Sequence, residues 1–207
     1  MATEQDLTST KPSVHRVILL GDSGVGKTSM FYRIKDGIFR DAGVSTTQIA
    51  EFDKHFRNTQ GEVTIQFVDT CGFETYHSSI PPSLLRNVHV VLFIYALDDS
   101  SSFLHLQHWY EETFEVVPEF LANKIIKFMV GNKSDLPRRV KKDQVTDNCS
   151  NRYGVIEENI FEVSAKEGTN IDELCNKISE CFAPQKRTPK PKPKLPNETR
   201  VPTCRCS

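Results

Sequence analysis

Between residues 14 and 182, short and almost wholly apolar runs alternate with longer segments whose apolar residues recur at helical spacing. Runs without polar alternation are typical of strands that are buried on both faces of a sheet. Strands of this kind separated by helices predict an α/β fold, with a mostly parallel sheet and helices on both of its faces. The predicted strands lie at residues 17–20, 49–56, 63–68, 88–97, 125–130 and 160–163.

The second and third of these strands flank the sequence Asn58-Thr59-Gln60-Gly61, which is typical of a tight turn. We therefore expect them to pair as an antiparallel hairpin, while the remaining strands run parallel to one another.

Two segments have clear helical stripes. The later one begins with Asn170 as a predicted N-cap and Glu173 three residues on as its capping partner. Its predicted inward-facing residues are Ile171, Leu174, Cys175, Ile178 and Phe182. The earlier stripe consists of Phe103, Leu106, Tyr110, Phe114 and Val117.

Charge is divided unevenly along the chain, although 26 basic residues nearly balance 27 acidic ones over its 207 residues. Residues 184–207 hold seven basic residues and one acidic residue, a net charge of +6, which leaves −7 for the remainder. Six prolines in the same stretch forbid a helix and favour an extended conformation. We therefore expect a flexible arm at residues 1–13, one compact domain at 14–182, and a disordered Pro/Lys-rich tail at 183–207.

The same patterns exclude several classes of protein. No apolar run approaches the roughly 20 residues of a transmembrane helix, and residues 1–13 lack the apolar core of a secretory signal. We therefore expect the protein to remain in a reducing compartment. The six cysteines and six histidines show neither zinc-ligand spacing nor a triad arrangement. The acidic body argues against nucleic-acid binding, and its combination with a basic tail indicates partners that the tail itself recognises.

The first chemical motif is GDSGVGKT at residues 21–28, which follows a predicted strand and matches G-x-x-x-x-G-K-[ST]. Its glycines let several backbone N–H groups point at one phosphate, and the helix that follows adds its positive end. Lys27 brings a positive charge to the β- and γ-phosphates, and the Thr28 hydroxyl suits Mg²⁺. The expected nucleotide-binding residues here are Asp22, Ser23, Gly24, Val25, Gly26, Lys27, Thr28 and Ser29.

Two further motifs follow predicted strands. Asn132-Lys133-Ser134-Asp135 comes after the fifth strand, and Ser164-Ala165-Lys166 comes after the sixth. Ligands of open parallel sheets bind at this edge, beyond the carboxyl ends of the strands. The Asp135 carboxylate can accept hydrogen bonds from both the ring N–H and the exocyclic amine of guanine. Adenine presents a different pattern, so the motif favours GTP over ATP.

In order and approximate spacing, GDSGVGKT, DTCG (Asp69 to Gly72), NKSD and SAK resemble the four motifs of Ras-superfamily small GTPases. The wording of the first motif, the extended tail and the CRCS sequence are most similar to the Rab branch. The resemblance implies a P-loop NTPase G domain whose six-stranded sheet has one antiparallel edge strand. It also implies a monomeric GTP/GDP switch that uses Mg²⁺ and acts in vesicle trafficking.

The resemblance assigns roles by position. Asp69 would hold Mg²⁺ through water, the Gly72 amide would contact the γ-phosphate, and Phe39 would pack against the guanine ring. The switch I threonine, which would bind Mg²⁺ only beside the γ-phosphate, is either Thr46 or Thr47. The number of residues from Lys27 and the number to Asp69 favour Thr46. The number of residues to Phe52 favours Thr47, which we prefer. The remaining nucleotide-binding residues would be Asn132, Lys133, Asp135, Ser164, Ala165 and Lys166.

One departure bears on catalysis, because Phe73 stands where the family has the glutamine that orients the attacking water. A phenyl ring cannot align water or accept a proton. We therefore expect slow intrinsic hydrolysis and name no certain catalytic residue. The alternative is a scaffold or adaptor that stays bound to GTP and does not hydrolyse it.

Cys204 and Cys206 lie in the sequence Cys-Arg-Cys-Ser, which is similar to the doubly prenylated CxC sequences of Rab proteins. Two lipid chains anchor a protein stably where one is marginal, and basic residues add attraction to an anionic leaflet. We expect the protein to lie on the cytosolic face of an intracellular membrane and to cycle through the cytosol. The partners implied by the resemblance are an exchange factor, a GTPase-activating protein, effectors, and a prenyl chaperone or GDP-dissociation inhibitor.

Overall fold

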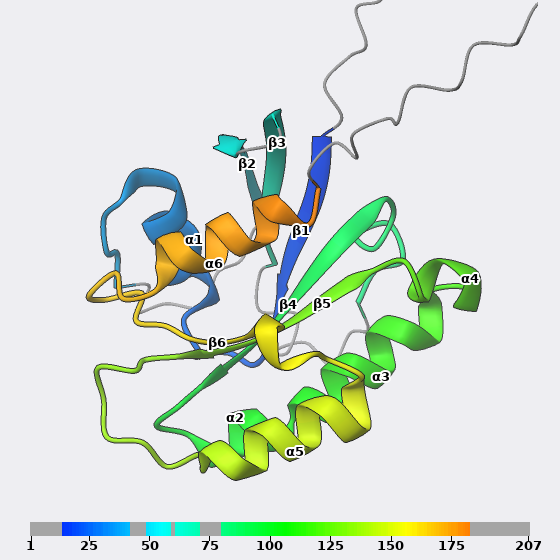
Figure 1. Ribbon diagram of the computed structural model, residues 1–207. Helices are drawn as coiled ribbons and strands as arrows, with labels where there is room; N and C mark the ends of the chain where they lie inside the picture. The colour runs from blue at the N-terminus through cyan, green and yellow to red at the C-terminus, as the bar shows by residue number, and fades with distance from the viewer. Residues whose placement is uncertain (1–13, 42–48, 59–60, 71–79, 183–207) are drawn as a thin grey trace, which may run out of the picture.

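The computed structural model describes residues 14–41, 49–58, 61–70 and 80–182 (Figure 1). Its strands are β1 (Val14–Leu20), β2 (Ala50–Asn58), β3 (Gly61–Asp69), β4 (Val88–Ala96), β5 (Ile126–Asn132) and β6 (Ile160–Glu162). Its helices are α1 (Lys27–Asp36), α2 (Ser100–Leu104), α3 (Leu106–Val116), α4 (Glu119–Ala122), α5 (Lys142–Tyr153) and α6 (Ile171–Glu180), with a 3₁₀ turn, η2, at Glu157–Asn159.

The strands form one sheet in the order β2-β3-β1-β4-β5-β6, so β1 and β4 lie at its centre. Strand β2 pairs antiparallel with β3, with Asn58 opposite Gly61, and all other neighbouring pairs are parallel. The predicted mostly parallel sheet, its hairpin and its single antiparallel edge strand are therefore confirmed.

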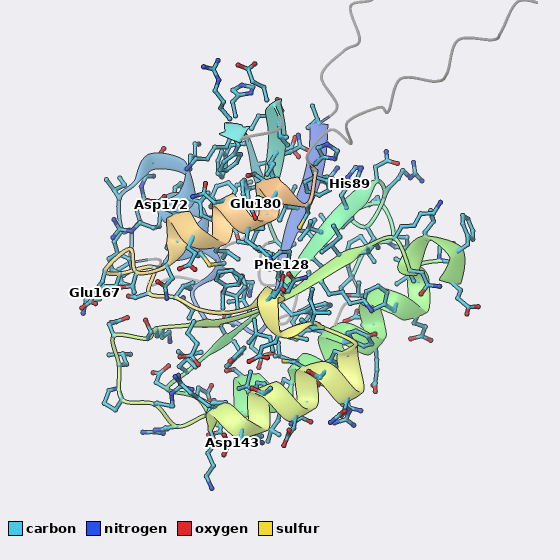
Figure 2. The ribbon with its side chains drawn as sticks, in the orientation of Figure 1. His89, Phe128, Asp143, Glu167, Asp172 and Glu180 are labelled. Carbon is cyan, nitrogen blue, oxygen red and sulfur yellow. The ribbon has the colours of Figure 1, made fainter. Side chains whose placement is uncertain are left out.

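Helices cover both faces of the sheet, as predicted (Figure 1). Helices α1 and α6 bury Met30, Phe31 and Leu174 against one face, whereas α2, α3 and α5 bury Phe103 and Val145 against the other. Figure 2 shows Phe128 of β5 inside the molecule, while Asp143 and Glu167 project from its periphery. The sheet is apolar on both sides because each of its faces has a helical layer to pack against.

The earlier helical stripe is divided between two helices, because α2 ends at Leu104 and α3 begins at Leu106. All of its predicted members still face the core. Phe103, Leu106 and Val117 are buried, and Tyr110 and Phe114 pack partly buried against the same cluster. The stripe survives the break because the linking residue, His105, keeps helical dihedral angles of −71° and −13°.

The capping box predicted at the start of α6 is wrong. Asn170 does occupy the N-cap position, but its φ of 58° places it in the left-handed region, and its side chain makes no capping hydrogen bond. Its amide instead donates to the carbonyl oxygen of Glu162 at 2.8 Å. The side chain therefore ties the start of α6 to the end of β6. The predicted inward stripe from Ile171 to Ile178 is buried.

The end of α6 packs against the start of β1. The rings of Phe182 and His15 stack with centroids 4.0 Å apart, and His89 of β4 meets His15 edge-on at 5.1 Å. Burial lowers the pKa of both imidazoles from the ordinary value, and the proximity of His89 lowers that of His15 further. This aromatic contact closes the edge of the sheet that lies away from the sequence motifs.

The buried cysteines belong to the apolar core. Cys175 lies in the inward stripe of α6, as predicted, and Cys149 is fully buried on α5. Burial raises the pKa of each thiol to about 12, so both remain protonated at neutral pH. Within the described residues, no helix is long and apolar enough to cross a membrane.

Candidate functional site

The parallel strands deliver the sequence motifs to one edge of the sheet. The GDSGVGKT loop follows β1, Asp69 is the last residue of β3, Asn132 is the last of β5, and Ser164 follows β6 after one further residue. These are the carboxyl ends of neighbouring strands, where doubly wound sheets bind their ligands.

The phosphate loop has the backbone that its glycines predict. Gly21, Gly24 and Gly26 have φ angles of 144°, 75° and 94°, which side-chain-bearing residues rarely adopt. A Cβ on Gly21 would lie 2.0 Å from the Ile94 carbonyl oxygen, and one on Gly26 would lie 2.3 Å from Nδ2 of Asn132. Two of the three glycines are therefore required by contact as well as by conformation.

Lys27, the first residue of α1, is held inside this loop. Its side chain is only 6% exposed. The ammonium group donates to the carbonyl oxygens of Gly21 and Asp22, at 2.5 and 2.7 Å. The loop thus curls around a fixed positive charge at a helix N-terminus, an arrangement suited to anionic phosphate.

The oxygen ligands expected for Mg²⁺ lie on adjoining elements. Asp69 is fully buried and stands beside Leu19 in the β1–β3 register, two residues before the loop. The hydroxyl of the next residue, Thr70, donates to the Leu19 carbonyl at 2.6 Å and fixes the end of β3. Thr28 follows Lys27 on α1. A hydroxyl and a carboxylate are hard oxygen donors, so these residues fit Mg²⁺.

Asn132 joins the phosphate loop to the loop after β6. Its side chain is 2% exposed. Its amide donates to the Val25 carbonyl at 2.8 Å, and its oxygen accepts from the Ala165 amide at 3.0 Å. One carboxamide therefore satisfies a buried acceptor and a buried donor that come from two separate motifs.

The loop after β6 also holds the side chain of Asp135. Ser164 Oγ donates to Asp135 Oδ1 at 2.6 Å and also accepts from the Glu167 amide at 3.0 Å. Within the described residues, Oδ2 of Asp135 takes part in no hydrogen bond that the structure records, and the side chain is half-buried. The carboxylate is therefore oriented by the protein and keeps acceptor capacity for a ligand.

The backbone between these two motif residues has its own constraints. Lys133 has a left-handed φ of 65°, and its ammonium lies 3.8 Å from Oδ1 of Asp98. The Ser134 amide donates to the Val163 carbonyl at 3.0 Å, which joins the turn to the strand beside it. A Cβ on Gly131 would lie 2.8 Å from the Tyr95 hydroxyl and 2.9 Å from Leu97 Cδ2, so a side chain there would displace both of these neighbours. Burial raises the pKa of Tyr95 far above its ordinary value.

Arg33 of α1 is a residue of the site that sequence reasoning missed. Its guanidinium donates to the carbonyl oxygens of Ala165, Lys166 and Gly37 at 2.7, 2.5 and 2.6 Å. The planar fork of arginine suits several acceptors at once. Arg33 thus links the end of α1 to the Ser164–Lys166 loop, and no local pattern in the sequence signals a contact across 132 residues.

The structure leaves some of the expected site residues undecided. Phe39 is described and 39% exposed, on the segment after α1, where Ser29 donates to the Arg40 carbonyl at 2.9 Å. Its contact with a guanine ring remains a prediction. Six other predicted site residues lie outside the described residues: Thr46, Thr47, Gly72, Phe73, Cys204 and Cys206.

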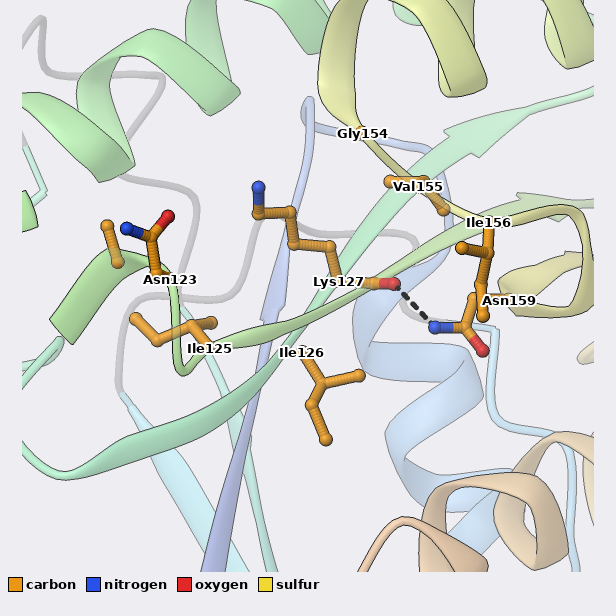
Figure 3. A pocket seen from close by; sticks show the side chains of 9 residues that line it. Asn123, Ile125, Ile126, Lys127, Gly154, Val155, Ile156 and Asn159 are labelled. Atoms are coloured by element: carbon orange, nitrogen blue, oxygen red, sulfur yellow. Dashed lines mark hydrogen bonds between the residues drawn. The ribbon is translucent and has the colours of Figure 1, made fainter. Parts of the chain in front are cut away.

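A cavity of about 230 Å³ lies at the opposite edge of the sheet, around the start of β5 (Figure 3). Ile125, Val155 and Ile156 form part of its apolar lining, and the Asn159 amide donates to the Lys127 carbonyl at 3.2 Å beside it. None of the sequence motifs lines this cavity, so the candidate functional site remains the motif-bearing edge.

The glycines of the phosphate loop give a matched pair of variants. Gly26→Ala combines left-handed strain with a clash against Asn132, whereas Gly24→Ala meets no atom within 4 Å. We expect about 1–2 kcal/mol of destabilisation for Gly24→Ala from strain alone, and at least about 1 kcal/mol more for Gly26→Ala. Urea unfolding measures both, and equal losses would contradict the packing role of Gly26.

Comparison with known proteins agrees with the family resemblance that the sequence motifs indicate. The model of the Ras family matches residues 16–182. Rab-26 of Rattus norvegicus is 32% identical over 159 residues, which cover 76% of this chain and 59% of that relative. RABG1 of Arabidopsis thaliana is 29% identical over 168 residues, which cover 79% of this chain and 80% of the relative. Rab-1D of Dictyostelium discoideum is 29% identical over 182 residues, which cover 85% of each chain.

The chain spans about three fifths of the length of the Rab-26 relative. The family model, in contrast, covers most of this chain and includes all of the described motifs. Because that match coincides with a phosphate loop and two further motif loops gathered at one edge of the sheet, the chain belongs to the Ras family, and it is similar to Rab proteins.

Proposed function

We propose that the protein is a Rab-like switch in intracellular membrane trafficking that binds GTP and GDP with Mg²⁺. The observation that carries the proposal is the double link made by Asn132, which fixes the phosphate loop and the Ala165 loop relative to each other. Two loops held in this way form a site for a ligand with a phosphate end and a base end.

Asp135 would recognise the base of the nucleotide. The Ser164 hydroxyl fixes one of its oxygens, so the carboxylate is oriented before a ligand arrives. The ring N–H and exocyclic amine of guanine are two adjacent donors that a carboxylate can accept. The adenine edge has no such pair, so we expect guanine nucleotides to be preferred.

Lys27 would turn from the two loop carbonyls toward the β- and γ-phosphates, and Thr28 and Asp69 would hold Mg²⁺. Bound Mg²⁺ would neutralise phosphate charge. Thr46 or Thr47 and the amide of Gly72 would respond to the γ-phosphate, and GTP would thereby order the two segments that effectors recognise.

Intrinsic hydrolysis would be slow because Phe73 replaces the glutamine that orients water in this family. The same substitution supports the second candidate, a scaffold that remains bound to GTP and acts without turnover. An activating protein that supplies an arginine finger could raise the rate by about 10³–10⁵ and would favour the switch.

Membrane attachment would come from geranylgeranyl groups on Cys204 and Cys206 and from the basic residues of the preceding tail. Each basic residue near an anionic leaflet adds on the order of 1 kcal/mol of attraction. The regulators expected of such a protein are an exchange factor, an activating protein, and a prenyl chaperone or GDP-dissociation inhibitor, with effectors that bind the GTP state.

The hydrolysis proposal predicts that Phe73→Gln speeds single-turnover conversion of bound GTP to GDP by about 10- to 100-fold, because the amide can align the attacking water through a hydrogen bond. Chromatography of the bound nucleotide over time measures the rate and identifies the base. A wild-type rate equal to that of Phe73→Gln would remove the slow-hydrolysis claim. Bound adenine nucleotide would remove the proposed function itself.

The anchoring proposal predicts a mass increase from prenyl groups on Cys204 and Cys206 in protein purified from native cells. Replacing both cysteines by serine should shift the protein from the membrane fraction to the soluble fraction. Cys181→Ser is a matched control, because this thiol is exposed but lies on the folded domain. An unmodified tail, or no shift in the double variant, would contradict the anchor.

A further inference from the structure

The side chain of Asp22, the second residue of the phosphate loop, points to helix α3. Nε1 of Trp109 donates to its Oδ1 at 2.7 Å, and Nδ1 of His105 lies 2.6 Å from its Oδ2. An ionised carboxylate only accepts hydrogen bonds, so the proton of this second bond belongs to Nδ1 of His105. Both oxygens of Asp22 are therefore held by residues that lie outside every nucleotide motif.

The backbone of Asp22 faces the other way, because its carbonyl accepts from the Lys27 ammonium at 2.7 Å. This one residue thus connects α3 with the charged centre of the phosphate loop. A shift of the Asp22 peptide would move an acceptor of Lys27 and the neighbouring loop N–H groups together.

The two donors are rigidly placed. Trp109 is 6% exposed, within the cluster that packs α2 and α3 against the sheet. His105 stands at the junction of α2 and α3, and its backbone N–H donates to the Ser101 carbonyl at 2.9 Å. Its imidazole is 62% exposed, but the backbone that carries it is fixed. Neighbouring Phe103 and Leu106 anchor the junction in the core.

We propose that His105 and Trp109 are positioning residues for the phosphate loop, which act through Asp22 and slow the release of bound nucleotide. The proposal rests on the nucleotide binding proposed above. With both carboxylate oxygens held, the loop has fewer conformations available before it binds, so less order must be gained when a phosphate enters. Loss of either donor leaves one oxygen of Asp22 without its bond, gives the side chain more freedom and loosens the contact with Lys27.

Release of tritium-labelled GDP from the full chain tests this proposal. His105→Ala should release GDP about threefold to tenfold faster, as expected for loss of one hydrogen bond of typical net strength. His105→Asn should remain within about twofold of the wild type, since the amide nitrogen of asparagine takes the place of Nδ1. Gln107→Ala is the control, because this side chain on the same helix bonds Glu111 at the surface and its loss should change nothing.

Trp109 supplies a second readout, because it is the only tryptophan in the sequence. A ¹H–¹⁵N spectrum therefore contains one indole N–H resonance. It should move upfield in Asp22→Ala, which removes its acceptor, and to a smaller extent in His105→Ala, which leaves that acceptor held by the indole alone, but not in Gln107→Ala. A purely structural role for His105 would make His105→Asn release GDP as fast as His105→Ala, and that result would overturn the proposal.

Unchanged GDP release together with an unmoved indole resonance in His105→Ala would also overturn it. Failure of the wild type to retain GDP at all would instead remove the proposed function. In that case the indole resonance alone decides whether His105 holds Asp22, and an unmoved resonance in His105→Ala rejects the positioning role.

Discussion

The buried carboxamide of Asn132 is the constraint on which the arrangement of the site depends. It occupies the space that Gly26 leaves by lacking a side chain, and it joins Val25 to Ala165 across the edge of the sheet. Loss of either bond would be destabilising, because it would leave a buried backbone group without a partner. Arg33 makes a second connection between α1 and the Ala165 loop. Hydrogen bonds from Asn132 and from Arg33 therefore hold the loops of the site together, and both sets of bonds lie within the protein.

Helix α3 connects the phosphate loop with a second region of the molecule. His105 and Trp109 hold Asp22, and one turn further along Glu112 accepts a hydrogen bond at 2.6 Å from the amide of Ile80. Ile80 is the first described residue after the segment that contains Phe73. One helical face thus meets both the loop that would bind phosphate and the end of the segment that would respond to it.

The sequence predicts the fold, and the places of the motifs within it, because both depend on local pattern. Apolar runs mark strands that are buried on two sides, and parallel topology then brings Lys27, Asn132 and Ser164 to the same edge. The contacts that fix those residues depend on distant parts of the chain. His105 and Asp22 are 83 residues apart, and no local pattern indicates that they meet. The capping box at Asn170 failed for a similar reason, since its side chain donates to the carbonyl of Glu162, eight residues away, and accepts no hydrogen bond from the helix.

Calorimetric titration of nucleotide-free protein with GDP, for wild type and Asn132→Ala, tests the central claim most directly. If one carboxamide holds the two halves of the site together, the variant should bind GDP about 10- to 100-fold more weakly, because two buried backbone groups lose their partners. Asn148→Ala, in which a half-buried asparagine that bonds the Gln144 carbonyl within α5 is changed, should bind as the wild type does. Equal GDP affinity for wild type and Asn132→Ala would contradict the account.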